Sequence, residues 1–273
     1  MKKIKQPGLL TLVLLITMSC TKLPLYQSKN ILDKETNKLR YYDADGKIMY
    51  DVFNDDKNVY VKMQTSDFIA QVKILRLGFT LWLDKDGKKS RDKGIVFPQK
   101  QSWNSLGRSK DGRSSQQQNQ TSEKQKQQMK QLQEQFRASP KNMVLVGMDE
   151  KGSRTIVNSE MEKSDIQVSI SFSVDNTLHY EAIIPIKKIF IETRLSDSVF
   201  SIGFESGYAE LGNSGMPSEG GTRSGGRGSG MGRGGMAGGA KGGGGRPDGN
   251  KAQNDSRSAL SEPIKIWFKI KLK

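Results

Sequence analysis

The sequence predicts an all-β protein, an antiparallel β-sandwich with one short helix and two low-complexity inserts. Apolar and polar residues alternate over 58–64, 79–84 and 264–272, which is typical of strands that bury one face. Asp-Gly dipeptides follow or separate such runs, and they are strong hairpin signals. The stretches 99–140 and 211–259 are too polar or too rich in glycine to form a core. We therefore expect the sandwich to be assembled from strands on both sides of each insert.

Residues 1–19 have the composition of a secretory signal peptide. Lysines precede an apolar run that is too short to span a bilayer as a mature helix. Cys20, the only cysteine of the chain, stands where bacterial lipoprotein signals place their acylated cysteine. The segment resembles a lipobox, with Ser19 before the cleavage point but Thr17 where that motif usually has Leu. The alternative is an ordinary secreted protein that loses Cys20 with the peptide.

An acylated Cys20 would tether the protein to a membrane in the cell envelope. No acidic run of the kind that resembles a surface-export tag follows it, which favours the outer membrane, facing the periplasm. The formal net charge of +15 stays strongly positive after the signal peptide is removed. An exported basic chain meets anionic lipid headgroups and acidic glycans rather than nucleic acid. The expected partners are the membrane and a glycan or an envelope protein.

The mature chain is expected to be a linker over 20–38 followed by one domain over 39–273. The hydrophobic content of 34% favours one core over two. A hairpin is predicted at Asp45-Gly46, between strands at 39–43 and 47–53. Further strands are predicted at 58–64, 79–84, 94–98, 142–148, 166–174, 178–184, 199–206 and 264–272.

A short amphipathic helix is predicted over 66–77, between two of these strands. Ser66 is the expected N-cap, and Gly78 suits the left-handed stop. This helix would cover one edge of the sandwich. A hairpin is predicted over 166–184, with Asp175-Asn176-Thr177 as its turn.

The insert 99–140 is rich in Gln, and its first part, 99–119, is expected to be disordered. Good helix formers follow over 122–138, with Met129, Leu132 and Phe136 on one stripe. That stripe could dock on the sandwich or on a partner. The favoured interpretation is a marginal helix that merely caps a long loop.

The insert 211–259 is dominated by glycine with interspersed arginine, which predicts a flexible, basic loop. Residues 230–235 match the letters of a dinucleotide-binding fingerprint, yet no strand precedes them and no helix follows. Because a strong strand pattern follows at 264–272, the two ends of this loop must lie near each other in space.

The order NVYVKMQT, a short helix, GFTLWLD, KDGK and GIVFP, and later HYEAIIPI and SIGFES, resembles a known family. The family is the carbohydrate-binding family 9-like, DOMON-related β-sandwich, and the likeness extends to exported lipoproteins of Bacteroidetes-type bacteria. It covers 47–98, 142–206 and the last strand. The resemblance implies a sandwich fold, and it implies sugar binding where an aromatic platform matches.

No residue set predicts catalysis, and the protein is expected not to be an enzyme. His179 is the only histidine, on the same strand face as Glu181, and zinc catalysis needs about three protein ligands. No G-x-S-x-G elbow occurs. A carboxylate pair of Glu181 with Glu205 or Asp84 stays open, because the separation is a three-dimensional quantity. No metal and no cofactor is predicted.

Asp84-Lys85-Asp86-Gly87 starts like a calcium loop. The twelfth position of that loop needs a bidentate Glu, where Ile95 stands instead. The same letters make a good hairpin turn, which is the favoured interpretation.

The strand phases place three aromatic residues on outer faces: Trp82, Trp267 and Tyr60. Together with Lys265 and Lys269 they are the predicted ligand-binding residues. Lysines around Trp267 suit an anionic glycan or lipid headgroup better than a neutral sugar. Two alternatives remain at this point, namely that the inserts cover the outward rings, or that the phase is inverted and Trp82 lies in the core.

The predicted function is that of a non-catalytic envelope lipoprotein which binds a carbohydrate or another envelope component through a face of the sandwich. The alternative is a structural or accessory outer-membrane protein that binds a protein partner through its inserts.

Overall fold

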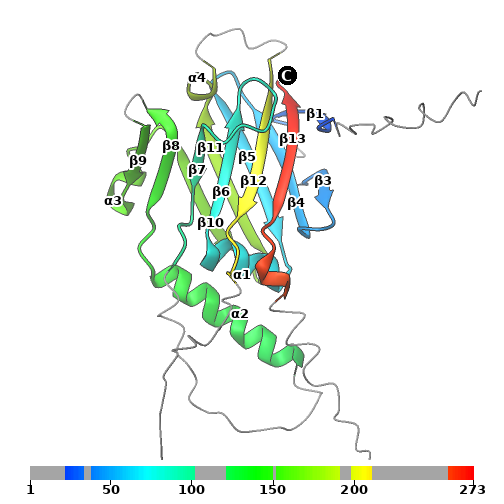
Figure 1. Ribbon diagram of the computed structural model, residues 1–273, viewed down its shortest axis with the longest axis vertical. Helices are drawn as coiled ribbons and strands as arrows, with labels where there is room; N and C mark the ends of the chain where they lie inside the picture. Colours follow the sequence, from blue (N-terminus) through cyan, green and yellow to red (C-terminus); the bar gives the residue numbers. More distant parts are fainter. Residues whose placement is uncertain (1–21, 34–37, 102–120, 150–151, 191–197, 211–257) are drawn as a thin grey trace, which may run out of the picture.

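The computed structural model describes residues 22–33, 38–101, 121–149, 152–190, 198–210 and 258–273, and in them two β-sheets form a sandwich (Figure 1). The predicted fold class is therefore confirmed. One sheet has seven strands, in the spatial order β1 (Leu25–Gln27), β13 (Lys265–Lys271), β12 (Val199–Ser206), β6 (Phe79–Asp84), β7 (Gly94–Val96), β8 (Met143–Asp149) and β9 (Gly152–Ile156). The other has six: β10 (Gln167–Phe172), β11 (Leu178–Pro185), β5 (Asn58–Thr65), β4 (Ile48–Asn54) and β2 (Lys29–Asn30), with β3 (Tyr41–Asp43) also paired to β4.

The alternating patterns place the core where the sequence predicts it. On β5 the side chains of Val59, Val61 and Met63 are buried, while the residues between them face outward. β6 and β13 follow the same rule, so the inverted phase is excluded. The predicted hairpins β3–β4 and β10–β11 are both present. The core between the sheets is filled by apolar side chains that include Phe79, Leu81, Phe200, Phe204, Phe268 and Ile270.

The predicted linker over 20–38 is wrong for its described part, because β1 and β2 lie in it. Both pair parallel to their neighbours, β1 with β13 and β2 with β4, so the sheets are mixed where antiparallel pairing alone was expected. The ring of Tyr26 stacks on Tyr41 with centroids 3.8 Å apart and packs against Phe268 at 5.7 Å. These strands are too short to show a period in the sequence.

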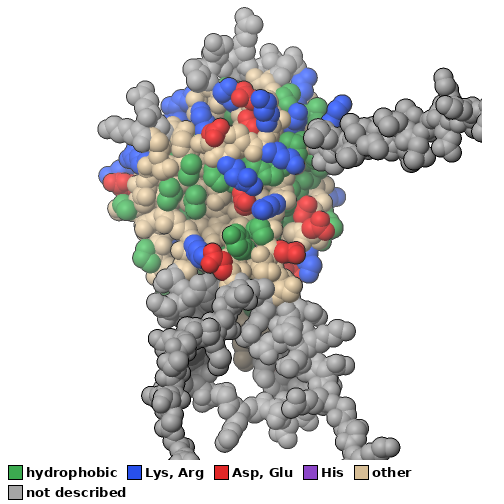
Figure 2. Space-filling view, viewed as in Figure 1, with side chains coloured by type: hydrophobic (Ala, Val, Ile, Leu, Met, Phe, Trp, Pro, Cys, Tyr) green, Lys and Arg blue, Asp and Glu red, His purple; other side chains and the backbone are tan. Residues whose placement is uncertain are grey.

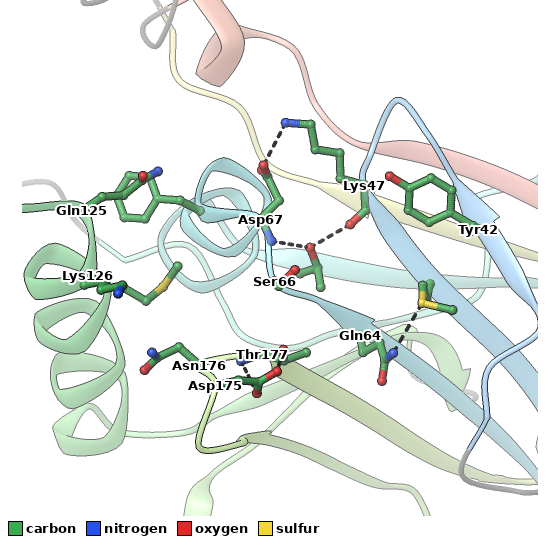
Figure 3. Close-up of a pocket in the computed structure, with 14 residues that line it drawn as sticks. Tyr42, Lys47, Gln64, Ser66, Asp67, Gln125, Lys126, Asp175, Asn176 and Thr177 are labelled. Atoms are coloured by element: carbon green, nitrogen blue, oxygen red, sulfur yellow. Dashed lines mark hydrogen bonds and ion pairs between the residues drawn. The ribbon is translucent and has the colours of Figure 1, made fainter. Parts of the chain in front are cut away.

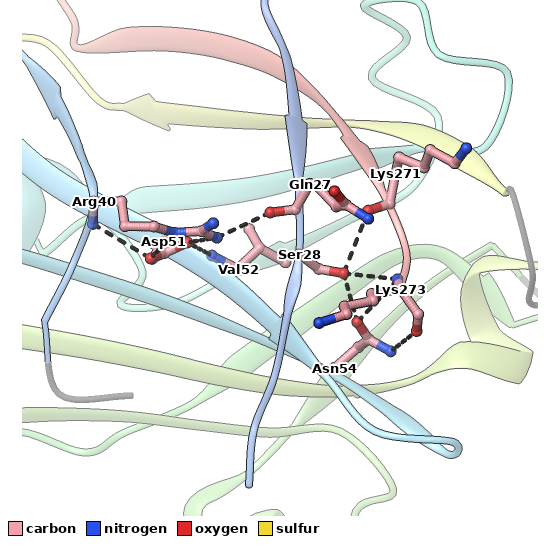
Figure 4. A network of polar contacts seen from close by, with 8 residues as sticks. All are labelled: Gln27, Ser28, Arg40, Asp51, Val52, Asn54, Lys271 and Lys273. Atoms are coloured by element: carbon pink, nitrogen blue, oxygen red, sulfur yellow. Dashed lines mark hydrogen bonds and ion pairs between the residues drawn. The ribbon is translucent and has the colours of Figure 1, made fainter. Parts of the chain in front are cut away.

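Polar contacts fix this N-terminal segment to the sandwich (Figure 4). The Ser28 hydroxyl donates to Asn54 Oδ1 at 2.5 Å and accepts from the backbone N–H of Lys273 at 3.1 Å. The fully buried carboxylate of Asp51 accepts from Nε and Nη2 of Arg40 at 2.7 and 2.6 Å. Hydrogen bonding to Asp51 raises the pKa of the Arg40 guanidinium. The segment thus belongs to the folded domain.

Helix α1 (Phe68–Leu77) lies at one end of the sandwich, as Figure 1 shows. Its N-cap is Asp67 and not the predicted Ser66, since the Asp67 carboxylate accepts from the backbone N–H of Ala70 at 2.9 Å. Gly78 follows the helix with a φ of 90° and a ψ of 162°, a conformation that suits glycine but is not the predicted left-handed helical stop.

Helix α2 (Thr121–Ala138) crosses the same end of the sandwich (Figure 1). Met129, Leu132 and Phe136 are all buried, and the Phe136 ring meets Phe172 of β10 edge to face at 6.0 Å. The helix therefore docks on the sandwich, and the favoured prediction that it merely caps a loop is wrong. The rest of the first insert, 102–120, and residues 211–257 of the second lie outside the described residues.

Strand β9 was not predicted, because only Ile156 of its five residues is buried and its sequence carries no apolar alternation. Two single-turn helices, α3 (Asn158–Met161) and α4 (Ile186–Ile189), also lie in the described part of the chain. Among the described helices, none has the length and apolar character needed to cross a bilayer.

Candidate binding site

The outer face of the seven-stranded sheet carries a row of two tryptophans and two glycines. Trp82 on β6 pairs with Gly94 on β7 and with Gly203 on β12, and Gly203 in turn pairs with Trp267 on β13. These four residues, Gly94, Trp82, Gly203 and Trp267, are called the tryptophan row below. Both indoles are partly exposed, and the helices in Figure 1 lie at the ends and side of the sheet rather than over this face.

Each indole lies across a neighbouring glycine. A Cβ atom added to Gly203 would stand 2.6 Å from Cε2 and Cζ2 of Trp267 and 2.8 Å from its Cδ2. One added to Gly94 would stand 2.5 Å from Cε3 of Trp82. Such distances are too short for real Cβ atoms, so any side chain at these glycines would displace the ring. One side of each indole therefore rests on the sheet, and each ring remains partly exposed.

The two rings are spaced by the sheet itself. Trp82 and Trp267 belong to strands that are separated by β12. Because neighbouring strands lie about 4.8 Å apart, the two tryptophan backbones are about 10 Å apart. That distance is roughly two pyranose rings in length, which suits an extended oligosaccharide.

Trp82 is held in place by an ion pair on the same face. Its Nε1 donates to Glu205 Oε2 at 2.9 Å, and Arg91 Nε donates to the same oxygen at 2.7 Å. Arg91 Nη2 reaches the other carboxylate oxygen at 3.3 Å. The carboxylate is thereby neutralised, and it fixes the orientation of the indole.

Lysines alternate with Trp267 along β13. Lys265 is exposed and Lys269 is half-buried, and among the described residues neither forms an ion pair. The ammonium group of Lys269 lies against the β6–β7 turn, because a Cβ atom added to Gly87 in that turn would stand 3.7 Å from Lys269 Nζ. The face shown in Figure 2 accordingly has hydrophobic side chains interspersed with basic and acidic ones.

The carboxylate of Asp84 is buried and organises the β6–β7 turn. It accepts from the backbone N–H groups of Asp86, Lys88 and Ser90, at 2.9, 3.1 and 2.9 Å. These bonds use both of its oxygens, which favours the predicted turn over a calcium loop.

Tyr60 is not part of this surface, because β5 belongs to the six-stranded sheet. Its hydroxyl donates to Asp55 at 2.7 Å, and that hydrogen bond raises the pKa of Tyr60. The predicted set of five ligand-binding residues is thus split. Trp82, Trp267, Lys265 and Lys269 share one face of the sandwich, and Tyr60 is on the other.

The candidate catalytic groups are also separated. His179 faces outward from β11, with Nε2 3.3 Å from the Ser173 hydroxyl. Glu181, beside it on the same face, lies 3.5 Å from Lys62 Nζ. Glu205 is on the outer face of the other sheet, so its pairing with Glu181 is excluded. Cys20, the predicted lipidation site, lies outside the described residues.

Sequence reasoning missed Gly94, Gly203 and Arg91, and it considered Glu205 only as a carboxylate partner of Glu181. Gly203 did carry a signal, because a single glycine inside a strand pattern indicates a close approach to the backbone. The hydrogen bond between Trp82 and Glu205 leaves no signal in the sequence, since it joins side chains 123 positions apart.

No family model and no curated protein matches the sequence. Among solved structures, the chain is similar to a family 9 carbohydrate binding module from Caldicellulosiruptor kristjanssonii in complex with cellotriose, with 10% identity, 92% of each chain covered and a TM-score of 0.33. It is also similar to a protein from Bacteroides uniformis that is provisionally described as carbohydrate-binding, with 6% identity, 67% of this chain and 84% of that chain covered and a TM-score of 0.32. Both TM-scores are low, and neither likeness supports a conclusion about what this chain binds.

Proposed function

We propose that this protein is a non-catalytic carbohydrate-binding protein and that the tryptophan row is its platform. The observation that carries the proposal is that Trp82 and Trp267 lie across glycines in one row of an outer sheet face. A pyranose presents a face of C–H groups, which stacks on an indole and removes apolar surface from water on both sides. A rigid pair of rings loses little conformational freedom when it binds.

The row and its surroundings also favour one kind of glycan. Rings two strands apart would contact two separate sugar units of one chain, which favours an oligosaccharide over a monosaccharide. Lys265 and Lys269 flank Trp267 without an acidic partner among the described residues, whereas Glu205 is neutralised by Arg91. Carboxylate or sulfate groups on the glycan would therefore be attracted to the β13 side of the row.

We also propose that Cys20 anchors the protein to the outer membrane, facing the periplasm. The segment between Cys20 and Leu25 would span at most about 18 Å when fully extended. Since β1 pairs with β13, a lipid anchor at Cys20 would keep the tryptophan row close to the membrane surface. Metabolic labelling with a palmitate analogue is expected to mark the wild-type protein and not Cys20→Ser.

The binding proposal is tested on a glycan array with the chain from residue 20 onwards, carrying Cys20→Ser so that it stays soluble. We expect a bound glycan, preferentially an acidic one, and loss of that signal in Trp82→Ala and in Trp267→Ala. Tyr60→Ala is the matched control, because it removes an outward aromatic ring from the opposite sheet. A folded protein that binds no glycan would sink the proposal, and crosslinking in the envelope would then identify a protein partner.

A further inference from the structure

A groove of about 640 Å³ lies at the end of the sandwich where α2 docks (Figure 3). Its walls come from the β3–β4 hairpin, the start of α1, the β10–β11 turn and α2. Met49 and Gln64 face it from the outer side of the six-stranded sheet, so it is separate from the tryptophan row. We call it the end groove.

The end groove is lined by three side-chain amides, of Gln64, Gln125 and Asn176, that have few other hydrogen-bond partners among the described residues. Among the described residues, Gln64 Nε2 hydrogen-bonds only to the sulfur of Met49, at 3.5 Å, and sulfur is a weak acceptor. The side-chain amides of Gln125 and Asn176 form no hydrogen bond to another described residue. Figure 3 shows these side chains on different walls of the groove. Each amide can both donate to and accept from a ligand hydroxyl.

The charges around the end groove are largely compensated. Lys47 Nζ is 2.8 Å from Asp67 Oδ2, and this hydrogen bond raises the pKa of Lys47. Asp175 accepts hydrogen bonds from Ser173 and Thr177, which lower its pKa. Lys126 lines another wall, so the four charged lining residues, Lys47, Asp67, Asp175 and Lys126, sum to no net formal charge. An uncharged ligand would therefore lose least on leaving water.

Aromatic and apolar surface alternates with these polar groups. The side chain of Tyr42 is 62% exposed at the rim, and Phe68 and Met129 contribute apolar surface between the amides. A pyranose carries the complementary pattern, with C–H faces and hydroxyl edges. A peptide would instead pair along a strand edge or lay an apolar helix face into an apolar groove.

Buried hydrogen bonds hold the walls together. Gln71 is fully buried, and its Nε2 donates to the backbone carbonyls of Thr65, at 3.0 Å, and Asn176, at 2.8 Å. The same carbonyl of Asn176 accepts from Gln133 of α2 at 3.5 Å. The strand end, the β10–β11 turn and α2 are thus linked before any ligand arrives, which favours a preformed site.

We propose that the end groove is a second saccharide site, specific for a neutral oligosaccharide, with one wall supplied by the helix of the Gln-rich insert. It uses none of the residues of the tryptophan row. Failure at one site therefore leaves the other proposal intact.

The test uses the chain from residue 20 with Cys20→Ser, in which Trp82→Ala and Trp267→Ala are combined to remove the tryptophan row. Cellotriose, xylotriose, maltotriose and chitotriose are the probes, measured by saturation-transfer NMR and then by calorimetry. We expect at least one trisaccharide to bind this background. Adding Tyr42→Ala should weaken binding at least about tenfold. Asn176→Gly should do the same while keeping the left-handed backbone, where φ is 64° at this position.

Tyr208→Ala is the matched control, because that side chain is 50% exposed and lies outside the end groove. It should leave the affinity unchanged. Since Tyr42 and Gln125 are exposed, Tyr42→Ala and Gln125→Ala should keep the thermal midpoint of the background, and either is sufficient for the test. The proposal is overturned if no trisaccharide binds the background, or if Tyr42→Ala, Asn176→Gly and Gln125→Ala each leave the affinity unchanged. Loss of all binding on removal of the row would leave the tryptophan row as the single site.

Discussion

Gly203 positions a ring that belongs to another strand. The indole of Trp267 covers the place where a Cβ would stand, and the nearest ring atoms are 2.6 Å from it. The glycine weakens its own strand, because it packs no side chain and loses more backbone entropy on folding. This loss of stability is consistent with a functional role for the Trp267 ring, which occupies the space above the glycine.

Gly203→Ala is therefore expected to lift the Trp267 ring from the sheet while both tryptophans stay present. Glycan binding should fall to near the level of Trp267→Ala, since the platform is lost, while the fold survives. Glycan-array signal and intrinsic tryptophan fluorescence report the two effects. Gly152→Ala is a useful control, because a Cβ there meets nothing within 4 Å, although its φ of 89° carries some strain. Unchanged glycan binding in Gly203→Ala would show that ring orientation is irrelevant.

The sequence indicates which side chains point outward but not which sheet they point from. Alternation predicted the outward position of Trp82, Trp267 and Tyr60, and all three face away from the core. It could not separate Tyr60 from the tryptophans, because period two distinguishes the two faces of a strand and carries no information on strand order. The ion pair of Arg91 with Glu205 was missed for a related reason, since the position of Arg91 depends on loop geometry.

At the scale of elements, burial rather than propensity holds α2 in place. The helix has mostly polar residues, and an isolated helix of this length is marginal in water. Leu132 and Phe136 are 2% and 3% exposed where they pack on the sandwich. A stripe of three apolar residues in the sequence cannot say what it packs on, and this is why docking could not be predicted.

Leu132→Ala should destabilise the protein by about 2–5 kcal/mol, as expected for a buried leucine in a close-packed site. The shift in the urea midpoint measures it. Glu134→Ala is the matched control, since this neighbour on the same helix is exposed and should change stability by no more than about 0.5 kcal/mol. If the two substitutions had equal effects, α2 would not be docked in solution. The end groove would then lose one wall.

The ion pair between Arg40 and Asp51 joins the segment before β3 to the centre of β4. Arg40→Met would leave the carboxylate of Asp51 buried without its cation, which should cost about 3–5 kcal/mol. Lys62→Met breaks the more exposed pair with Glu181, at 3.5 Å, and should cost at most about 1 kcal/mol. Chemical denaturation of the two variants compares them directly. If the two variants lost similar free energies of unfolding, burial would not make the Arg40–Asp51 pair more important than the exposed pair.

The whole molecule is closed along one side by residues that precede its first long strand. β1 covers the edge of β13, and Tyr26 shields Tyr50 and Phe268 between the sheets, with ring centroids 6.4 and 5.7 Å away. Ser28 also connects Asn54 to the backbone of Lys273 near the end of the chain. Long periodic strands were predictable from the sequence, whereas these strands of two or three residues have only tertiary contacts to specify them.

A chain that begins at residue 38 is therefore expected to be less stable than one that begins at residue 22. Removing β1 and β2 would expose the β13 edge and the rings of Tyr50 and Phe268, at a cost of about 3–5 kcal/mol, similar to the loss of a large buried aromatic side chain. Urea denaturation followed by tryptophan fluorescence gives both midpoints. The bare edge should also promote association, visible by size exclusion, because unpaired strand edges template pairing with other chains. Equal midpoints and a monomeric short chain would restore the linker interpretation of 20–38. A drop in midpoint would mean that any lipid attached at Cys20 is joined almost directly to the folded sandwich, which restricts how far the tryptophan row can move from the membrane.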